Sequence, residues 1–138
     1  MTASDPYLQP FAAGTRAGAV AVMVSSALYP RLDPGHLAMW SSAIVTGLLR
    51  KKLGWTGMVV SDDLGTAAAA RALPVGRRAA DFVAAGGDLV LTVAPSQATT
   101  MRNAIVARAA SDPAFRARVA DAVTNVLAAK QALGLLHC

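Results

Sequence analysis

Two adjacent aspartates, Asp62 and Asp63, are the residues whose type and position most clearly suggest chemistry. They follow the run 57–61 (GMVVS), which has the length and composition of a buried strand. In parallel α/β folds, functional side chains gather where strands end, because the loops rise from the sheet there. An ionised aspartate is costly to bury, so it needs hydrogen bonds, a cation or a catalytic task at such a place. Position alone leaves open that one of the pair only caps the next helix.

The composition restricts what kind of site these aspartates could build. All eight acidic residues of the chain are aspartates, so any carboxylate chemistry must use aspartate. The single cysteine, Cys138, excludes a disulfide framework and a cysteine-rich zinc site. Gly86-Gly87 is not a phosphate-binding loop, because no Gly-Lys-Ser or Gly-Lys-Thr follows it. The composition therefore favours a site whose chemistry depends on aspartate.

The net charge of +5 raises the question of a nucleic-acid partner. The basic residues are scattered, and the only dense run, Arg50-Lys51-Lys52, falls at the end of a predicted helix, where cations offset the helix dipole. We therefore expect no nucleic-acid partner. No apolar run reaches the roughly 18 residues of a membrane-spanning helix, and the N-terminus lacks the basic and apolar stretches of a signal peptide. We expect no membrane segment, and the sequence assigns no cellular compartment.

The elements that must position the aspartates alternate along the chain. Short apolar runs predict strands at 19–25, 57–61 and 88–93. Apolar residues at helical spacing predict helices at 41–53, 74–85, 96–110 and 113–133. Because the strands are apolar throughout, we expect them to be buried on both faces and to lie parallel, in chain order, with helices on one face of the sheet. This pattern alone does not distinguish an open sheet from a barrel.

Start and stop signals support these helices. Ser41 or Ser42 can cap the first, and Gly54 suits the left-handed position just past its end. Pro74 fits the first turn of the second helix, and Gly86-Gly87 stops it. Asp112 is a plausible cap for the last helix. Its expected buried stripe comprises Phe115, Val119, Val123, Val126, Leu127 and Leu133.

A longer segment around the aspartates points to a family. Residues 48–64 (LLRKKLGWTGMVVSDDL) resemble the signature of family 3 glycoside hydrolases, particularly their β-N-acetylglucosaminidase branch. In that family the first aspartate after the serine is the catalytic nucleophile, which here is Asp62, and Trp55 replaces the more usual phenylalanine. Further blocks at 18–24, 29–34, 84–91 and 130–136 resemble the family in the same order, so the likeness covers about residues 8–136.

The resemblance implies both a fold and a reaction. It implies the C-terminal portion of a (β/α)8 barrel, with about three of the eight βα units and a closing helix, so that residues 1–138 form a partial barrel domain. It implies retaining hydrolysis of a terminal β-linked N-acetylglucosamine, as in peptidoglycan fragments, without a metal or other cofactor. A partial barrel leaves strand edges and apolar surface uncovered, so we expect the isolated chain to self-associate and to be inactive.

The sequence departs from the family at two places. The branch takes its proton donor, a histidine paired with an aspartate, from a loop that includes a Lys-His-Phe-Pro-Gly-His-Gly segment, and nothing in this chain matches that loop. Ser26 stands where the family often carries a histidine. His36, in a turn-like stretch, is interpreted as an ordinary loop histidine, and His137 lies at the terminus. Asp88, after two glycines, is assigned a turn or capping role.

Two other functions stay open at this point. Asp62 and Asp63 could hold magnesium in an α/β phosphotransfer domain, although no second acidic cluster accompanies them. The chain could also be a barrel remnant without catalysis that acts as an association module. The nucleophile hypothesis makes a geometric prediction, because neighbouring residues of a strand point to opposite sides. Asp62 should point toward the barrel axis, and Asp63 toward backbone amides or solvent.

Overall fold

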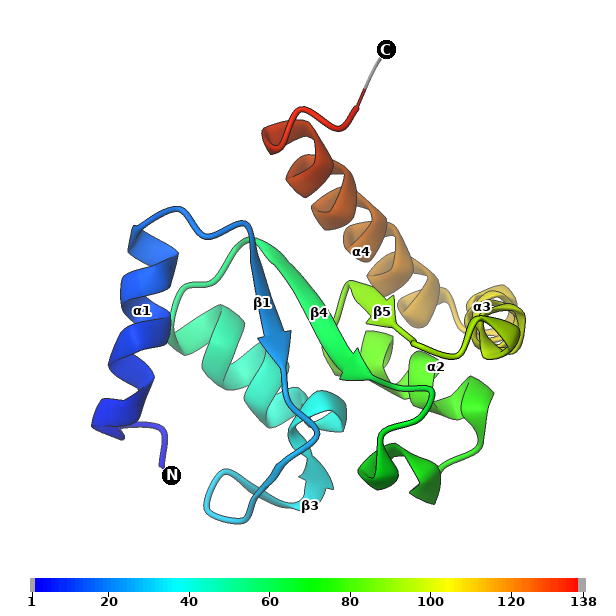
Figure 1. Ribbon diagram of the computed structural model, residues 1–138, viewed down its shortest axis with the longest axis horizontal. Coiled ribbons are helices and arrows are strands. Elements are labelled where there is room, and N and C mark those ends of the chain that lie inside the picture. The colour runs from blue at the N-terminus through cyan, green and yellow to red at the C-terminus, as the bar shows by residue number, and fades with distance from the viewer. Residues whose placement is uncertain (1, 137–138) are drawn as a thin grey trace.

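A three-stranded parallel sheet forms the centre of the computed structural model, which describes residues 2–136. Its strands are β1 (Ala21–Val24), β4 (Met58–Asp63) and β5 (Leu89–Leu91), in that spatial order (Figure 1). Val22 pairs with Val59, and Val60 pairs with Leu89. The predicted strands, their parallel pairing and their order are confirmed, with β5 shorter than expected.

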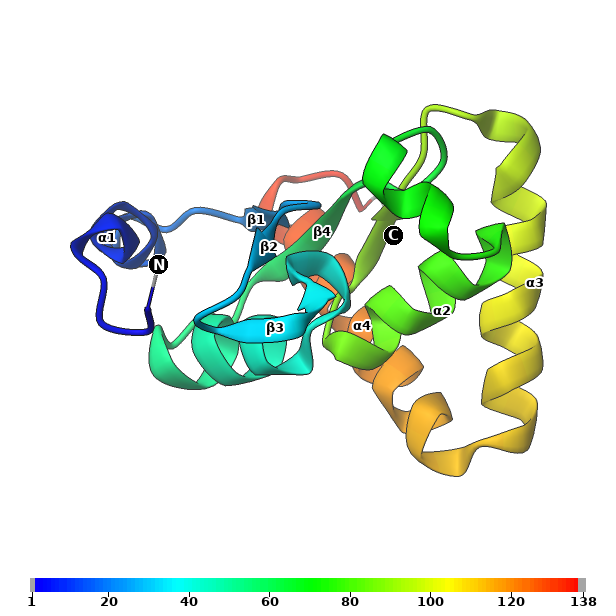
Figure 2. The same cartoon turned by 90° about the horizontal axis from the view of Figure 1, so that it is seen from below.

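Helices connect and cover these strands. They are α1 (Gln9–Arg16), η3 (Ala43–Lys52), α2 (Val75–Ala85), α3 (Pro95–Ser111) and α4 (Pro113–Ala132), with the short turns η1 (Pro6–Leu8), η2 (Ala38–Trp40) and η4 (Ala68–Ala72). A small antiparallel hairpin, β2 (Leu28–Tyr29) and β3 (Asp33–Leu37), was not predicted. Figure 2 shows α1 at one end of the sheet and α3 at the other. Within residues 2–136 no helix has both the length and the apolar character needed to span a bilayer.

Local interactions mark several of these helix ends. The Ser41 hydroxyl accepts a hydrogen bond from the Ile44 amide at 3.2 Å, ahead of η3, which is wound as a π-helix. Gly54 and Gly86 adopt the left-handed conformation beyond η3 and α2, with φ of 71° and 117°. The Asp112 carboxylate caps α4 through the Phe115 amide, as predicted. Pro74 precedes the first turn of α2 rather than occupying it, which corrects the predicted boundary by one residue.

The core lies between one face of the sheet and the helices behind it. Val59 of β4 is fully buried against this layer, together with Val45 of η3 and Phe82 of α2. Burying a side chain of this size stabilises the fold by about 1.5–3 kcal/mol. On α2, Ala79, Phe82 and Val83 are all buried and form the side of the helix that faces the core.

Within residues 2–136 no helix covers the opposite face of the sheet. Met23 of β1 is 61% exposed, and Leu89 and Leu91 of β5 are 40% and 39% exposed. The expectation that the strands are buried on both faces is therefore wrong for the part of the chain that the structure describes. An apolar strand sequence records what a face is suited to contact, whereas burial depends on whether another element is there to make the contact.

The stripe predicted for α4 is only partly correct: Phe115 is buried and Val119 packs against the same core cluster, whereas three other members are exposed. Val123, Leu127 and Leu133 are about half exposed, at 51%, 46% and 56%. The buried residues of α4 are Phe115, Ala122 and Ala129. Small side chains let a helix approach its neighbours closely, so Ala122 and Ala129 continue the contact that Phe115 makes, while Val123 and Leu127 lie outside it.

Candidate active site

The two aspartates form the last two residues of β4. The sequence predicted that the pair follows the strand. The strand instead extends to Asp63, so both aspartates lie within its C-terminal end. Along β4, Val59 and Ser61 are buried under the helices. The residues that alternate with them along the strand, Met58, Val60 and Asp62, are only partly buried. Because successive strand residues point to opposite faces, this alternation assigns Asp62 to the uncovered face of the sheet.

Asp62 is held by donors from the segment after β1 and from β4 itself. Its Oδ2 accepts hydrogen bonds from the Ser26 hydroxyl at 2.7 Å and the Ser26 amide at 3.3 Å. Its Oδ1 accepts one from the Asp63 amide at 2.8 Å. Ser26 comes two residues after Val24, the β1 residue paired with Ser61, so strand pairing brings its loop to Asp62. In the sequence, Ser26 stands out only as a departure from the family. The pairing of Val24 with Ser61 is the signal that could have predicted the contact between Ser26 and Asp62.

These hydrogen bonds keep the carboxylate of Asp62 ionised. The Ser26 hydroxyl, followed by the Asp63 amide, holds the pKa of Asp62 below its usual range, although partial burial acts in the opposite direction. Within residues 2–136 no arginine, lysine or histidine forms an ion pair with it. Asp62 is therefore a charged, partly exposed carboxylate at a strand end without a neutralising cation.

Asp63 has a different set of partners. Its Oδ1 accepts from the amides of Gly65 at 2.9 Å and Val93 at 3.1 Å, and its Oδ2 accepts from the amide and hydroxyl of Thr66. Burial raises the pKa of Asp63, but the hydrogen bonds from Thr66, Val93 and Gly65 outweigh it and lower the pKa to about 2. The expectation that Asp63 turns toward backbone amides is confirmed. This residue closes the turn after β4 and ties it to the segment after β5.

This arrangement gives no support to the magnesium alternative. Both oxygens of Asp63 are already occupied by protein donors. In the part of the chain that the structure describes, no three His, Cys, Asp or Glu side chains gather to hold a metal ion. A cation bound at Asp63 would have to compete with the hydrogen bonds that shape the turn.

Asp88 has a larger structural role than the turn or cap assigned to it. Its side chain is fully buried just before β5, where Oδ2 accepts from Arg50 Nη2 at 2.6 Å and from the Val59 amide at 2.8 Å. Its Oδ1 accepts from Arg118 and, at 3.0 Å, from Asn125 Nδ2. The predicted place of Arg50 in the last turn of a helix is confirmed, and its guanidinium binds this buried carboxylate rather than only facing the dipole.

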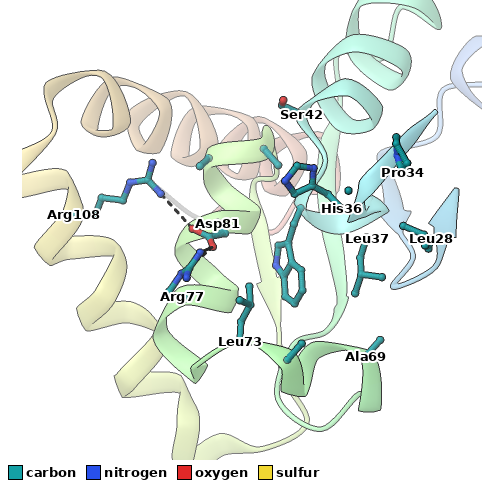
Figure 3. Close-up of a pocket in the computed structure, with 15 residues that line it drawn as sticks. Leu28, Pro34, His36, Leu37, Ser42, Ala69, Leu73, Arg77, Asp81 and Arg108 are labelled. Carbon is teal, nitrogen blue, oxygen red and sulfur yellow. Dashed lines mark hydrogen bonds and ion pairs between the residues drawn. The ribbon is translucent and has the colours of Figure 1, made fainter. Parts of the chain in front are cut away.

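His36 belongs to another part of the surface. It lies in β3 rather than in a loop, and its Nδ1 is 3.0 Å from Asp33 Oδ2. It lines a cavity of about 720 Å³ together with Trp40, Arg77 and Arg108, and Asp62 does not line this cavity (Figure 3). Arg77 and Arg108 converge there on Asp81. His137 lies outside the described residues.

Comparison with known proteins identifies the kind of protein in which this site occurs. The sequence family described as "Glycosyl hydrolase family 3 N terminal domain" matches residues 3–129. Over 104 residues the chain is 38% identical to a beta-hexosaminidase of Xanthomonas campestris pv. campestris (strain B100), a match spanning 73% of this chain and 30% of that protein. A beta-hexosaminidase of Stenotrophomonas maltophilia (strain K279a) is 37% identical, over 78% of this chain and 32% of that protein.

Solved structures share the fold closely. The crystal structure of beta-N-acetylhexosaminidase from Beutenbergia cavernae DSM 12333 matches 95% of this chain with a TM-score of 0.92 and 46% identity, and 39% of that chain is covered. A glycoside hydrolase family 3 beta-N-acetylglucosaminidase from Paenibacillus sp. str. FPU-7 matches 90% of this chain with a TM-score of 0.84 and 34% identity, and 24% of that chain is covered. The predicted α/β barrel-type architecture is confirmed, and the chain spans about a third of the length of the curated relatives it matches.

Proposed function

The chain belongs to glycosyl hydrolase family 3, among the β-N-acetylhexosaminidase-like members, and from that premise we propose that Asp62 is the nucleophile of a retaining glycosidase. One observation carries the proposal above the others. Asp62 is an ionised carboxylate at the C-terminal end of β4, on the sheet face that no helix covers. In barrel enzymes, catalytic groups lie at this end of the strands.

In the proposed reaction, a carboxylate oxygen of Asp62 attacks the anomeric carbon of the sugar. The bond from that carbon to the leaving oxygen breaks with its electron pair, and a general acid protonates the oxygen. Water then attacks the same carbon, a general base takes its proton, and the electron pair of the ester bond returns to Asp62. The transition states carry positive charge on the sugar ring, which a nearby carboxylate without a cation partner can stabilise.

The acid and base are proposed to come from barrel units that these 138 residues do not include. The histidine that the structure describes, His36, pairs with Asp33 and lines a cavity to which Asp62 does not contribute. Asp88 is buried among Arg50, Arg118 and Asn125. On this proposal residues 1–138 are a partial barrel domain that carries the nucleophile and is inactive alone.

The proposed substrate is a terminal β-linked N-acetylglucosamine, with peptidoglycan-type fragments as the expected natural source. Support comes from the names of the relatives, which include beta-hexosaminidases and a beta-N-acetylglucosaminidase. The competing proposal, a remnant without catalysis, makes a different prediction for the same ligand. It would bind the sugar without hydrolysing it.

A chimeric enzyme provides the test. The portion of the Beutenbergia cavernae enzyme that this chain does not cover is joined to these 138 residues, and hydrolysis of an aryl β-N-acetylglucosaminide is measured. A fluorinated glycosyl fluoride, whose glycosyl-enzyme hydrolyses slowly, should label the peptide containing Asp62, as detected by mass spectrometry. Asp62→Ala should be inactive and partly rescued by azide, an external nucleophile that fits the vacated space. Labelling of another residue would refute the assignment.

We also propose that the isolated chain self-associates through its uncovered sheet face. Met23, Leu89 and Leu91 leave apolar area in contact with water, and burial of apolar area drives association. The edges of β1 and β5 carry backbone groups without a further strand partner within residues 2–136. Light scattering should therefore show dimers or larger species. A monodisperse monomer with cooperative unfolding would contradict this proposal.

A further inference from the structure

We infer that Ser26 is a positioning residue that decides which oxygen of Asp62 attacks the sugar: Oδ1 forms the bond, and Oδ2 is held by Ser26. The inference deepens the proposed function and rests on it. Ser26 itself touches neither the sugar nor the leaving group in this scheme. It acts through the nucleophile.

The hydrogen-bond geometry distinguishes the two oxygens. A carboxylate oxygen has two in-plane lone pairs. Oδ2 accepts two donors, the hydroxyl of Ser26 at 2.7 Å and its amide at 3.3 Å, so both of its lone pairs are engaged. Among residues 2–136, Oδ1 has a single donor, the Asp63 amide at 2.8 Å, which leaves its second lone pair without a partner there. The oxygen with the free lone pair can attack without losing a hydrogen bond.

The two donors of Ser26 also fix the orientation of the carboxylate plane. They come from one residue on the segment after β1, and the Asp63 amide comes from β4. Rotation of the carboxylate about its terminal torsion would break contacts on both sides. Holding the attacking atom in one direction saves part of the entropy that the reaction would otherwise cost.

Ser26 should affect the two chemical steps differently. In the first step Asp62 loses negative charge as Oδ1 bonds to the anomeric carbon, and the charge-assisted bond at Oδ2 weakens. In the second step the ester bond breaks, the electron pair returns to the carboxylate, and the bond at Oδ2 strengthens. The hydroxyl of Ser26 therefore favours departure of the carboxylate, which is the hydrolysis of the glycosyl-enzyme.

Ser26 is also the main group that stabilises the negative charge of Asp62. Its hydroxyl is the largest influence that lowers the pKa of Asp62, and the backbone amides of Asp63 and Ser26 add to it. Asp63, the adjacent charge on β4, acts in the opposite direction through like-charge repulsion. No ion pair with Asp62 occurs between residues 2 and 136.

The contact can be tested on the 138-residue chain without any activity. Carbon-13 labelling of the aspartate carboxyls follows the titration of Asp62, which is assigned by the Asp62→Asn variant. Ser26→Ala should raise the pKa of Asp62, and Ser26→Thr, which keeps a hydroxyl, should restore the lower value. Ser25→Ala is the matched control, because the Ser25 hydroxyl contacts Tyr29 and the Ala27 amide instead. An unchanged pKa in Ser26→Ala would overturn the inference.

The kinetic consequence is tested in the chimera. Ser26→Ala should slow hydrolysis of the glycosyl-enzyme about 10-fold or more, the effect of losing one hydrogen bond to a charged group. A pre-steady-state burst of the aryl alcohol should appear or grow, kcat should fall more than kcat/KM, and the acid limb of kcat/KM should move to higher pH. An equal fall in kcat and kcat/KM with an unmoved acid limb would overturn the role.

A crystal structure of the trapped glycosyl-enzyme tests the assignment of the oxygens. The Ser26 hydroxyl should lie beside the carbonyl oxygen of the ester, and finding it beside the ester oxygen bonded to the sugar would reverse the assignment. Failure of the proposed function gives a separate result. In that case Asp62→Asn would keep its hydrolytic activity, while the carboxyl titration would still report on the contact between Ser26 and Asp62.

Discussion

Two aspartates at opposite ends of the sheet have their negative charges stabilised in different ways. Asp88, at the N-terminal end of β5, is fully buried and paired with the guanidinium groups of Arg50 and Arg118. Asp62, at the C-terminal end of β4, is partly exposed and held by a hydroxyl and two backbone amides. The first carboxylate has its charge neutralised by cations. The second is stabilised only by dipoles.

The difference separates a structural carboxylate from one suited to catalysis. A buried charge must be paired, and once it is paired its field is cancelled for any third group. A carboxylate that hydrogen bonds alone keep ionised still attracts a cationic transition state. Barrel folds divide their two ends in the same way, with chemistry at the C-terminal ends of the strands and stability at the other.

The largest expected effect is on activity, at the C-terminal end. In the chimeric enzyme, Asp62→Asn should lower kcat/KM by a factor on the order of 10⁴ or more, because an amide cannot serve as the nucleophile. Its unfolding free energy should change by less than about 1 kcal/mol, since no buried charge loses a partner. Steady-state kinetics and urea unfolding of the same preparations measure both. A variant that lost stability rather than activity would remove the distinction between the two ends.

The second effect is on stability, at the N-terminal end. Asp88→Ala should cost about 3–5 kcal/mol of unfolding free energy, because Arg50 and Arg118, which are mostly buried, lose the fully buried carboxylate that pairs with both of them. Asp121→Ala is the matched control. Its side chain is 73% exposed and lies 3.6 Å from Arg118, so the expected change is within about 0.5 kcal/mol. Urea midpoints that were equal for the two variants would contradict the structural role of Asp88.

A third, smaller effect concerns Asp63, beside the proposed nucleophile. Asp63→Ala removes the acceptor for the amides of Gly65, Thr66 and Val93. Loss of such a cap should cost about 1–2 kcal/mol, and hydrogen exchange at those amides should accelerate. In the chimera kcat/KM should fall far less than in Asp62→Asn. A loss of activity equal to that of Asp62→Asn would mean that the two aspartates act as one unit.

The sequence predicted the features that depend on local signals. Gly54 and Gly86 mark helix ends because the left-handed conformation costs glycine little, and Asp112 caps a helix through an amide three residues away. The parallel order of β1, β4 and β5 followed from the alternation of apolar strands and helices, since a right-handed crossover returns the chain to the adjacent position.

The features that the sequence did not predict depend on contacts between residues far apart in the chain. Asp62 and Ser26 are separated by 36 positions, and Asp88 meets Arg118 and Asn125 from 30 and 37 positions away. Periodicity does not report such contacts, because it describes one element at a time. It also failed for part of α4, where Phe115, Ala122 and Ala129 make the buried contact and Val123 and Leu127 do not.

The smallest effect is the pH dependence that Asp63 adds at the C-terminal end of the sheet. Its pKa is lowered from 3.8 to about 2, so the folded state binds its proton more weakly than the unfolded state does. The resulting stabilisation is therefore complete above about pH 4 and is lost as the pH falls from about 4 toward 2. Asp63→Asn removes this titration while leaving the shape of the side chain nearly unchanged. Urea unfolding at intervals from pH 5 to pH 2 should show the wild type more stable than the variant at pH 5, with a difference that shrinks as the pH falls. Asp62 also has a lowered pKa and titrates in both proteins, so its contribution differs between them only through the like-charge repulsion from Asp63 that the variant removes. A difference that stayed constant down to pH 2 would show that the amides around Asp63 bind the carboxylate and its protonated form equally well.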